Sequence, residues 1–263
     1  LQTFPLIGNY GFIAEDAESA KPYLTAYIVR EKCNNPSNFR CGETLDKYLK
    51  DNNIPGIYDV DTREITKIIR ESGVMNAMIC SDPRNFDKEK VETYRVSGAV
   101  EAVTAKTPLP VACENPKYNV VLLDYGKKEN IVRELVKRGC NVAVVPSGTK
   151  ADDVLKLNPD GIMLSNGPGD PSDNADCINE LKKLIGKKPI FGICLGHQLL
   201  ALAMGAKTTK LKYGHRGVNQ PVKCIETGRT YISSQNHGYA VLNDEIEKCG
   251  GIISYINGND GTN

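Results

Sequence analysis

Short apolar runs alternate with segments of helical spacing through the second half of the chain, and this pattern predicts an α/β fold. The run at 118–124 (YNVVLLD) precedes a predicted helix over 128–138. Further apolar runs lie at 141–145, 160–165 and 189–193, with predicted helices near 176–185 and over 195–204. Near-continuous apolar strands separated by helices indicate a mostly parallel sheet covered on both faces. Because ligands bind beyond the carboxyl ends of such strands, we expect a site in the loops after Asp124, Ser165 and Ile193.

The first half contains fewer and shorter elements, which predict a smaller α/β domain. Segments 23–30 and 54–60 are rich in β-branched and aromatic residues, as strands are. Helices are predicted over 43–50 and 61–72, the second with Asp61 as its N-cap and Gly73 as the residue that ends it. A connector with three prolines and no periodicity, 104–117, separates the halves. We therefore expect two domains, 1–112 and 113–263, with the boundary near Ala112.

The composition argues against several classes of partner and site. The 263 residues hold 33 basic and 32 acidic side chains, and this near balance argues against nucleic acid or a membrane surface as the main partner. No apolar run approaches the roughly 18 residues of a membrane span, and no secretory signal opens the chain. The nine cysteines are scattered without metal-like spacing, so we expect no metal site and a reducing compartment. This favours the cytoplasm, or an organelle if a transit peptide preceded residue 1.

The sequence GICLG at 192–196 lies between a predicted strand and a predicted helix and has the form of a nucleophile elbow. Gly192 and Gly196 would allow the tight turn that leaves Cys194 exposed. A helix N-terminus also favours the thiolate, which is the reactive form of cysteine. A free cysteine taken alone is more often a small core residue, but this turn favours a nucleophile. The other eight cysteines lie in no such turn.

The loop NGPGDP at 166–171 follows the neighbouring predicted strand. It is either a plain strand-to-helix turn or, if the sheet order brings it beside the elbow, a source of backbone N–H groups that join Leu195 in binding a developing oxyanion. A cysteine hydrolase also needs a general base, usually histidine. His197, His215 and His237 are the three candidates, and none is a compelling base because each also fits a packing or turn role.

Three segments of the second half, SNGPGDP at 165–171, FGICLGHQLLALAMG at 191–205 and SSQNHGYAV at 233–241, resemble the class I (triad) glutamine amidotransferases. In the first half, FPLIGNYG, SNFR, IPGIYDVDTREITKIIRESG and VMNAMI resemble the N-terminal domain of the carbamoyl phosphate synthetase small subunit. The resemblance covers nearly the whole chain. It implies a C-terminal flavodoxin-like amidotransferase domain after a smaller α/β domain, and the activity of a glutaminase subunit.

By this resemblance, Cys194 attacks the side-chain amide of glutamine, ammonia leaves, and water releases glutamate from the thioester. The backbone N–H groups of Leu195 and Gly169 would form the oxyanion hole. The residues implied to hold glutamine are Gly167, Gly169, Leu195, Gln198, Asn236, Gly238 and Tyr239.

The resemblance also implies a partner. Ammonia would pass to a large synthetase subunit, or to a fused synthetase domain, which uses bicarbonate and ATP to make carbamoyl phosphate. That partner would hold ATP and Mg²⁺, and no cofactor is expected on this chain. Both arginine and pyrimidine synthesis are possible destinations.

One part of the family pattern is absent from this sequence. The base and its orienting carboxylate come from a His-Pro-Glu motif, and none of the three histidines has Glu two residues later. We therefore expect this motif to lie beyond Asn263, and a leading strand that supplies a serine contact to precede Leu1. On that expectation, these 263 residues alone would hydrolyse glutamine poorly.

Three alternatives remain open at this point. A stand-alone flavodoxin-like cysteine hydrolase would use the same elbow but would not need the first domain. A non-catalytic scaffold subunit would keep the fold, although it would not need Cys194. Another amidotransferase of the same class would lack the first-half motifs.

Overall fold

The computed structural model describes all 263 residues, which form two compact units, Leu1–Met75 and Asn76–Asn263. No helix in either unit has the length and apolar character needed to cross a membrane.

The first unit consists of short strands and two helices. Strands β1 (Leu6–Ile7) and β3 (Glu31–Lys32) pair in parallel, as do β2 (Tyr27–Ile28) and β4 (Gly56–Ile57). Helix α1 covers Leu45–Asp51 and α2 covers Thr62–Ser72, with a 3-10 turn at Ala14–Asp16. Val29, Leu49 and Ile54 are its buried apolar side chains.

Two details of this unit show how local chemistry sets element ends. The Asp61 side chain accepts a hydrogen bond from the Glu64 N–H at 3.0 Å, and Gly73 ends α2 at φ +89°, so both predicted caps are confirmed. The predicted strand over 54–60 is wrong in extent, because β4 has two residues. Pro55 has no N–H to donate and Asp59 has φ +63°, which is not an extended conformation.

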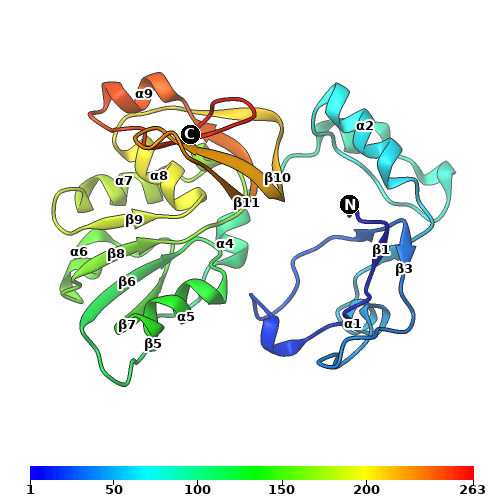
Figure 1. Cartoon of the computed structure of the whole chain (residues 1–263), viewed down its shortest axis with the longest axis horizontal. Coiled ribbons are helices and arrows are strands. Elements are labelled where there is room, and N and C mark those ends of the chain that lie inside the picture. The colour runs from blue at the N-terminus through cyan, green and yellow to red at the C-terminus, as the bar shows by residue number, and fades with distance from the viewer. The chain divides into compact units, whose positions relative to one another are not determined.

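The second unit is built on a five-stranded sheet of order β5-β7-β6-β8-β9 (Figure 1). Its strands are β5 (Leu109–Val111), β6 (Tyr118–Asp124), β7 (Cys140–Pro146), β8 (Gly161–Leu164) and β9 (Ile190–Gly192). The last four are parallel, and β5 is antiparallel to β7. The expected mostly parallel sheet is confirmed. Since β7 and β8 lie on opposite sides of β6, the strand order reverses between β6 and β8, where open α/β sheets bind ligands.

Both faces of this sheet are covered, as the near-continuous apolar strands predicted. On one face, Val121 and Leu123 pack with side chains of α6 (Ala151–Lys156), α7 (Ala175–Leu184) and α8 (Leu195–Ala203). On the other face, Leu122 packs with Val132 of α5 (Glu129–Lys137). Neighbouring residues of β6 thus point into two separate apolar clusters.

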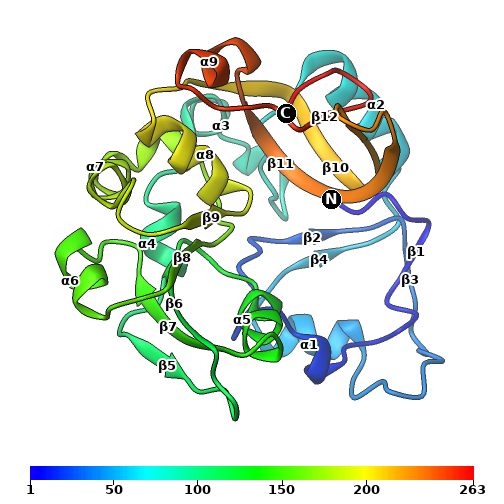
Figure 2. The same cartoon turned by 60° about the vertical axis from the view of Figure 1, so that its left-hand side comes forward.

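A long antiparallel pair follows the sheet domain and was not predicted. Strands β10 (Thr208–Cys224) and β11 (Thr230–Val241) curve together in Figure 2, and β12 (Tyr255–Asn257) pairs with the end of β10. Helix α9 (Asn243–Lys248) connects β11 to β12. The register shifts between Lys210 and His215 and again between Gly217 and Gln220. Such irregularities strengthen the bend of a strand pair.

Along the chain, the boundary between the compact units lies between Met75 and Asn76, whereas the sequence predicted a domain boundary near Ala112. The intervening residues include α3 (Lys88–Thr93), α4 (Ala99–Val103) and a 3-10 turn at Pro83–Asn85. Val100 of α4 is 2% exposed and belongs to the larger apolar cluster of the second unit. The predicted connector also contains β5, which was missed because a three-residue edge strand with a central proline has no periodicity to read.

This attachment has a measurable consequence. Replacing Val100 by alanine is expected to lower the free energy of unfolding of the second unit by about 2 kcal/mol, because the lost methyl groups leave a void in a packed core. Denaturant unfolding measures the change. The control Val96→Ala removes a side chain that is 56% exposed and is expected to change it by less than about 0.5 kcal/mol. Equal effects of the two substitutions would contradict the assignment of α4 to this core.

Candidate active site

Cys194 lies in a strained turn between β9 and α8. Its φ of +52° and ψ of −108° are unfavourable for any residue with a side chain, and it is the residue that precedes the first turn of α8. The turn is held by hydrogen bonds from the Ile193 N–H to the Leu164 carbonyl at 3.0 Å and from the Gly196 N–H to the Ser165 carbonyl at 3.1 Å. Both acceptor carbonyls lie at the end of β8, so this neighbouring strand holds the elbow in place.

The two glycines of the elbow are required by close backbone contacts. A Cβ on Gly192 would lie 2.6 Å from the Gly196 carbonyl carbon and the His197 nitrogen. A Cβ on Gly196 would lie 2.5 Å from the Leu164 carbonyl oxygen. These are backbone atoms that cannot rotate away. The expected role of both glycines in the tight turn therefore has a direct steric basis.

The loop after β8 packs directly against the elbow. A Cβ on Gly167 would lie 2.3 Å from the Tyr125 carbonyl oxygen and 2.6 Å from a methyl carbon of Leu195. The Tyr125 N–H donates to Ser165 Oγ at 2.9 Å, and Asn166 Nδ2 donates to the Gly126 carbonyl at 3.0 Å. The ends of β6, β8 and β9 thus meet at one place, which is the place where the sheet order predicts a ligand.

Strand β11 reaches the same place through two contacts of Tyr239. Gln198, which is 6% exposed on α8, donates through Nε2 to the Tyr239 carbonyl at 2.7 Å. The Tyr239 hydroxyl is hydrogen-bonded to Asp170 of the loop after β8. Burial and this carboxylate raise the pKa of Tyr239 to about 12, so the hydroxyl keeps its proton at neutral pH. Tyr239 therefore joins the elbow helix to the glycine-rich loop.

The other predicted glutamine contacts lie on these same segments. Gly169 has φ +90° and is exposed in the loop after β8. Asn236 is exposed on β11 opposite Arg216, and a Cβ on Gly238 would lie 3.3 Å from Arg216 Nη2. All predicted site residues thus lie on the elbow and its helix α8, in the loop after β8 or at the end of β11. Their roles toward glutamine remain predictions.

Asp170 is a site residue that the sequence did not single out. Although its burial acts to raise the pKa of the carboxyl, hydrogen bonds from Ser172 and Tyr239 bring that pKa below its ordinary value. Asp170 therefore stays ionised and available to the Tyr239 hydroxyl. Asp170 lies within the sequence NGPGDP, but its partner Tyr239, which is 69 positions later, is found only in the folded chain.

The electrostatics of Cys194 differ from the expectation for a helix N-terminus. Burial raises the pKa of its thiol, and a hydrogen bond from the Leu195 N–H lowers it by a smaller amount. The expected help from the helix start is present, but burial outweighs it. The same N–H donates to the sulfur and has no backbone acceptor.

The raised pKa of Cys194 predicts how the alkylation of its thiol depends on pH. The thiolate of Cys194 forms as pH rises, so the rate of alkylation by iodoacetamide is expected to climb about tenfold per pH unit up to a midpoint above the roughly 8.5 of a free thiol. Peptide mapping of the alkylated residue at each pH measures the rate. A rate that stays level between about pH 6 and 8 would contradict the raised pKa.

None of the three histidines is hydrogen-bonded to Cys194. His197 is exposed on α8, and its Nε2 lies 3.4 Å from Asn263 Oδ1. His215 Nδ1 and His237 Nε2 lie 3.1 Å from each other, on β10 and β11. The predicted turn role is therefore wrong for His215 and His237, because both residues lie in paired strands. Across the whole chain, no group of three or more His, Cys, Asp or Glu side chains is placed to hold a metal ion.

Comparison with known proteins agrees with this geometry. Residues 121–263 match the family model "Glutamine amidotransferase class-I", and residues 1–79 match "Carbamoyl-phosphate synthase small chain, CPSase domain". The second match ends close to the boundary between the compact units.

Curated relatives match over nearly the full chain. A carbamoyl phosphate synthase small chain from Clostridium perfringens is 49% identical over 99% of this chain and 74% of its own length. One from Fusobacterium nucleatum is 51% identical over 98% of this chain and 72% of its own. A carbamoyl phosphate synthase pyrimidine-specific small chain from Bacillus subtilis is 48% identical over 99% and 71%. The chain therefore belongs to the carbamoyl phosphate synthase small chain family, and its second half is a class-I glutamine amidotransferase domain.

Proposed function

We propose that Cys194 is the nucleophile that releases ammonia from glutamine for carbamoyl phosphate synthesis. Its sulfur attacks the carbonyl carbon of the glutamine side chain, and the resulting tetrahedral intermediate expels the amide nitrogen, which gains a proton and leaves as ammonia. Water then attacks the thioester, glutamate leaves, and the sulfur regains its proton.

The observation that carries this proposal is the strained elbow itself. The backbone conformation of Cys194, with φ +52°, is strained and costs free energy. A cysteine that only fills space in a core does not need this conformation. Here the strain presents Cys194 at the carboxyl end of β9, against the glycine-rich loop that follows β8. The family match over the first unit and the elbow together disfavour a stand-alone hydrolase and a non-catalytic scaffold.

The oxyanion would be held by two backbone N–H groups. That of Leu195 points at the Cys194 sulfur, and that of Gly169 lies in the loop packed against Leu195. Neither N–H has a backbone acceptor. Donors fixed in this way before the reaction stabilise negative charge without reorganisation. Gly167, Gln198, Asn236, Gly238 and Tyr239 would line the position of glutamine beside them.

The product ammonia would be used by a large synthetase chain that holds ATP and Mg²⁺, with no cofactor on this chain. The family name supports such a partner, because a small chain implies a larger one. The pyrimidine-specific relative makes pyrimidine synthesis one destination and leaves arginine synthesis as the other. All nine cysteines are unpaired thiols, which favours the reducing cytoplasm.

Affinity labelling tests the proposal. A diazo-ketone analogue of glutamine is expected to add once per chain, on Cys194, and excess glutamine is expected to block it. Intact mass gives the stoichiometry and peptide mapping gives the residue. Folded protein that takes no label, or takes it equally on several cysteines, would move the scaffold function to the front.

A further inference from the structure

The side-chain amide of Asn166 joins the loop after β8 to the turn between β6 and α5. Its Nδ2 donates to the Gly126 carbonyl at 3.0 Å, and its Oδ1 accepts from the Lys128 N–H at 3.1 Å. Both partners are backbone groups, 40 and 38 positions earlier in the chain. One side chain therefore pairs with an acceptor and a donor of the neighbouring turn, and this pairing ties the loop to the turn.

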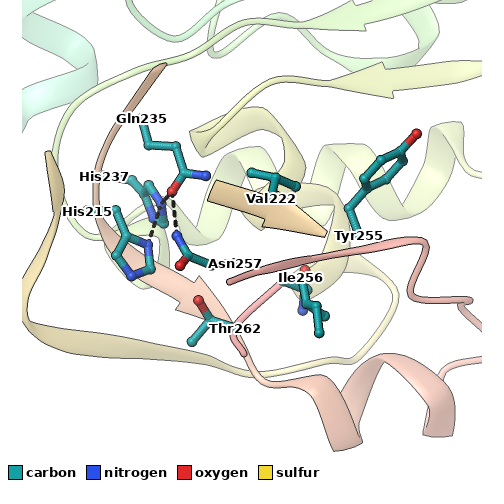
Figure 3. A pocket seen from close by; sticks show the side chains of 9 residues that line it. His215, Val222, Gln235, His237, Tyr255, Ile256, Asn257 and Thr262 are labelled. Carbon is teal, nitrogen blue, oxygen red and sulfur yellow. Dashed lines mark hydrogen bonds between the residues drawn. The ribbon is translucent and has the colours of Figure 1, made fainter. Parts of the chain in front are cut away.

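The pocket in Figure 3 shows a contrasting arrangement. There the Asn257 Nδ2 donates to a side-chain atom, Oε1 of Gln235, at 3.0 Å. A side-chain partner can rotate to follow the asparagine, whereas a backbone partner moves only with its own segment. The hydrogen bonds of Asn166 therefore constrain where the backbone of the loop after β8 lies.

The turn that Asn166 contacts is itself held by Asp124 at the end of β6. Asp124 is 4% exposed. Its Oδ1 accepts from the N–H groups of Gly126 at 2.9 Å and Lys127 at 2.7 Å, and its Oδ2 accepts from the Ala105 N–H at 2.9 Å. One carboxyl group thus pairs with three backbone donors. The Gly126 carbonyl is therefore a fixed acceptor for the Asn166 amide.

Steric contact keeps the loop from moving closer to this turn. A Cβ on Gly167 would lie 2.3 Å from the Tyr125 carbonyl oxygen, and a Cβ on Gly126 would lie 3.0 Å from Pro168 Cδ. Glycine is therefore needed for the two backbones to lie this close. Contact limits movement of the loop toward the turn, and the two hydrogen bonds of Asn166 limit movement away from it.

Asn166 lies between the residue that holds the elbow and the residues of the expected oxyanion hole. Before it, the Ser165 carbonyl accepts from the Gly196 N–H at 3.1 Å. After it, the chain leads to Gly169, which has φ +90° and an N–H without a backbone acceptor. Removing the Asn166 amide would leave the bond of Ser165 in place and would free residues 167–169 from the turn.

We infer that Asn166 is a positioning residue for the oxyanion hole, because its amide holds the Gly167–Gly169 backbone against the turn after β6 and so fixes the Gly169 N–H beside the elbow. This inference rests on the proposed function of Cys194. Donors that are in place before the reaction stabilise developing charge without reorganisation. The effect of Asn166 therefore belongs to the transition state and not to bound glutamine.

The γ-aldehyde analogue of glutamine measures the oxyanion hole without turnover. The Cys194 sulfur bonds to the aldehyde carbon, the C=O π bond breaks and the thiol proton passes to the oxygen, which gives a tetrahedral hemithioacetal. Its oxygen takes the position of the oxyanion, whereas glutamine itself reports ground-state binding. For each ligand, the concentration that half-protects Cys194 against iodoacetamide is measured on the unaltered protein and on each variant.

Asn166→Ala is expected to raise the half-protecting concentration of the aldehyde about tenfold and that of glutamine less than about twofold. Asn166→Asp keeps the volume and the Oδ1 acceptor, but it puts an oxygen opposite the Gly126 carbonyl. It is therefore expected to weaken the aldehyde at least as much. In the complex with a large chain, both variants are expected to lower kcat for ammonia release about tenfold, with KM within about twofold.

Asn141→Ala supplies the matched control. Asn141 is half-buried like Asn166, donates through Nδ2 to Asn119 at 3.1 Å and accepts from the Cys113 N–H at 3.0 Å. It lies near the amino end of β7, at the sheet edge opposite the elbow. This variant is expected to lower the thermal midpoint about as much as Asn166→Ala and to leave both half-protecting concentrations unchanged.

The outcomes separate this inference from the proposed function. Equal aldehyde affinity in the unaltered protein and both Asn166 variants would overturn the positioning role while leaving Cys194 as the nucleophile. An equal loss for aldehyde and glutamine, or the same selective loss in Asn141→Ala, would also overturn it. If Asn166→Ala does not fold, the same ratio measured on Asn166→Asp decides. If neither ligand protects the unaltered protein, the proposed function fails, and the positioning role fails with it.

Discussion

Replacing Cys194 by alanine is expected to abolish the diazo-ketone adduct and, in the complex with a large chain, to reduce glutamine-dependent ammonia release by about four orders of magnitude. No other cysteine lies in the turn between β9 and α8, and without a thiol there no thioester can form. The fold is expected to survive, because alanine is smaller and the turn is held by backbone hydrogen bonds from β8. Intact mass and an ammonia assay on the purified complex measure both effects.

The control for this substitution is Cys249→Ala. Cys249 is a half-buried thiol that follows α9, in the same compact unit but in no strained turn. This variant is expected to keep one adduct per chain and the ammonia rate of the unaltered complex. If Cys194→Ala still took the label, or if both variants lost it, Cys194 would not be the nucleophile.

Replacing Gly196 by alanine is expected to destabilise the second unit by about 3 kcal/mol and to abolish labelling of Cys194. The added Cβ would lie 2.5 Å from the Leu164 carbonyl oxygen, so the start of α8 has to move away from β8. That movement breaks the hydrogen bond from the Gly196 N–H to the Ser165 carbonyl and turns the Leu195 N–H away from the sulfur. Thermal unfolding is expected to shift downward by roughly 6–12 °C.

Gly148→Ala is the matched control, because nothing lies within 4 Å of the position its Cβ would take and its φ is not positive. Its effect on the free energy of unfolding is expected to stay within about 0.5 kcal/mol, with labelling unchanged. A Gly196→Ala variant as stable and as reactive as Gly148→Ala would show that the elbow does not depend on close backbone contact.

Features that depend on neighbours in the sequence were predicted well. The run at 118–124 is β6, because an apolar strand of a parallel sheet is recognisable from its own composition. Asp61 and Gly73 end α2 as predicted, since capping uses a side chain and a backbone conformation within one turn. The elbow at Cys194 was also predicted, because the glycines that permit it lie two residues away on each side.

Features that depend on distant partners were decided by the tertiary structure. Strand β5 exists because β7 supplies its hydrogen bonds, and α4 belongs to the second unit because Val100 fills a gap in that unit's core. The pKa of Cys194 is raised because the folded chain buries it, which outweighs the helix start that the sequence revealed. The contact of His215 with His237 and Asp260 joins residues up to 45 positions apart.

The sequence by itself thus determined the family, the mostly parallel sheet and the position of the strained turn at Cys194, because each depends on short motifs or on the polarity of single elements. The tertiary structure alone decided which loops meet at Cys194, how deeply that thiol is buried and which histidines are in contact. The physical reason is that these properties depend on distances between residues far apart in the chain, and such distances are set by packing and not by local sequence.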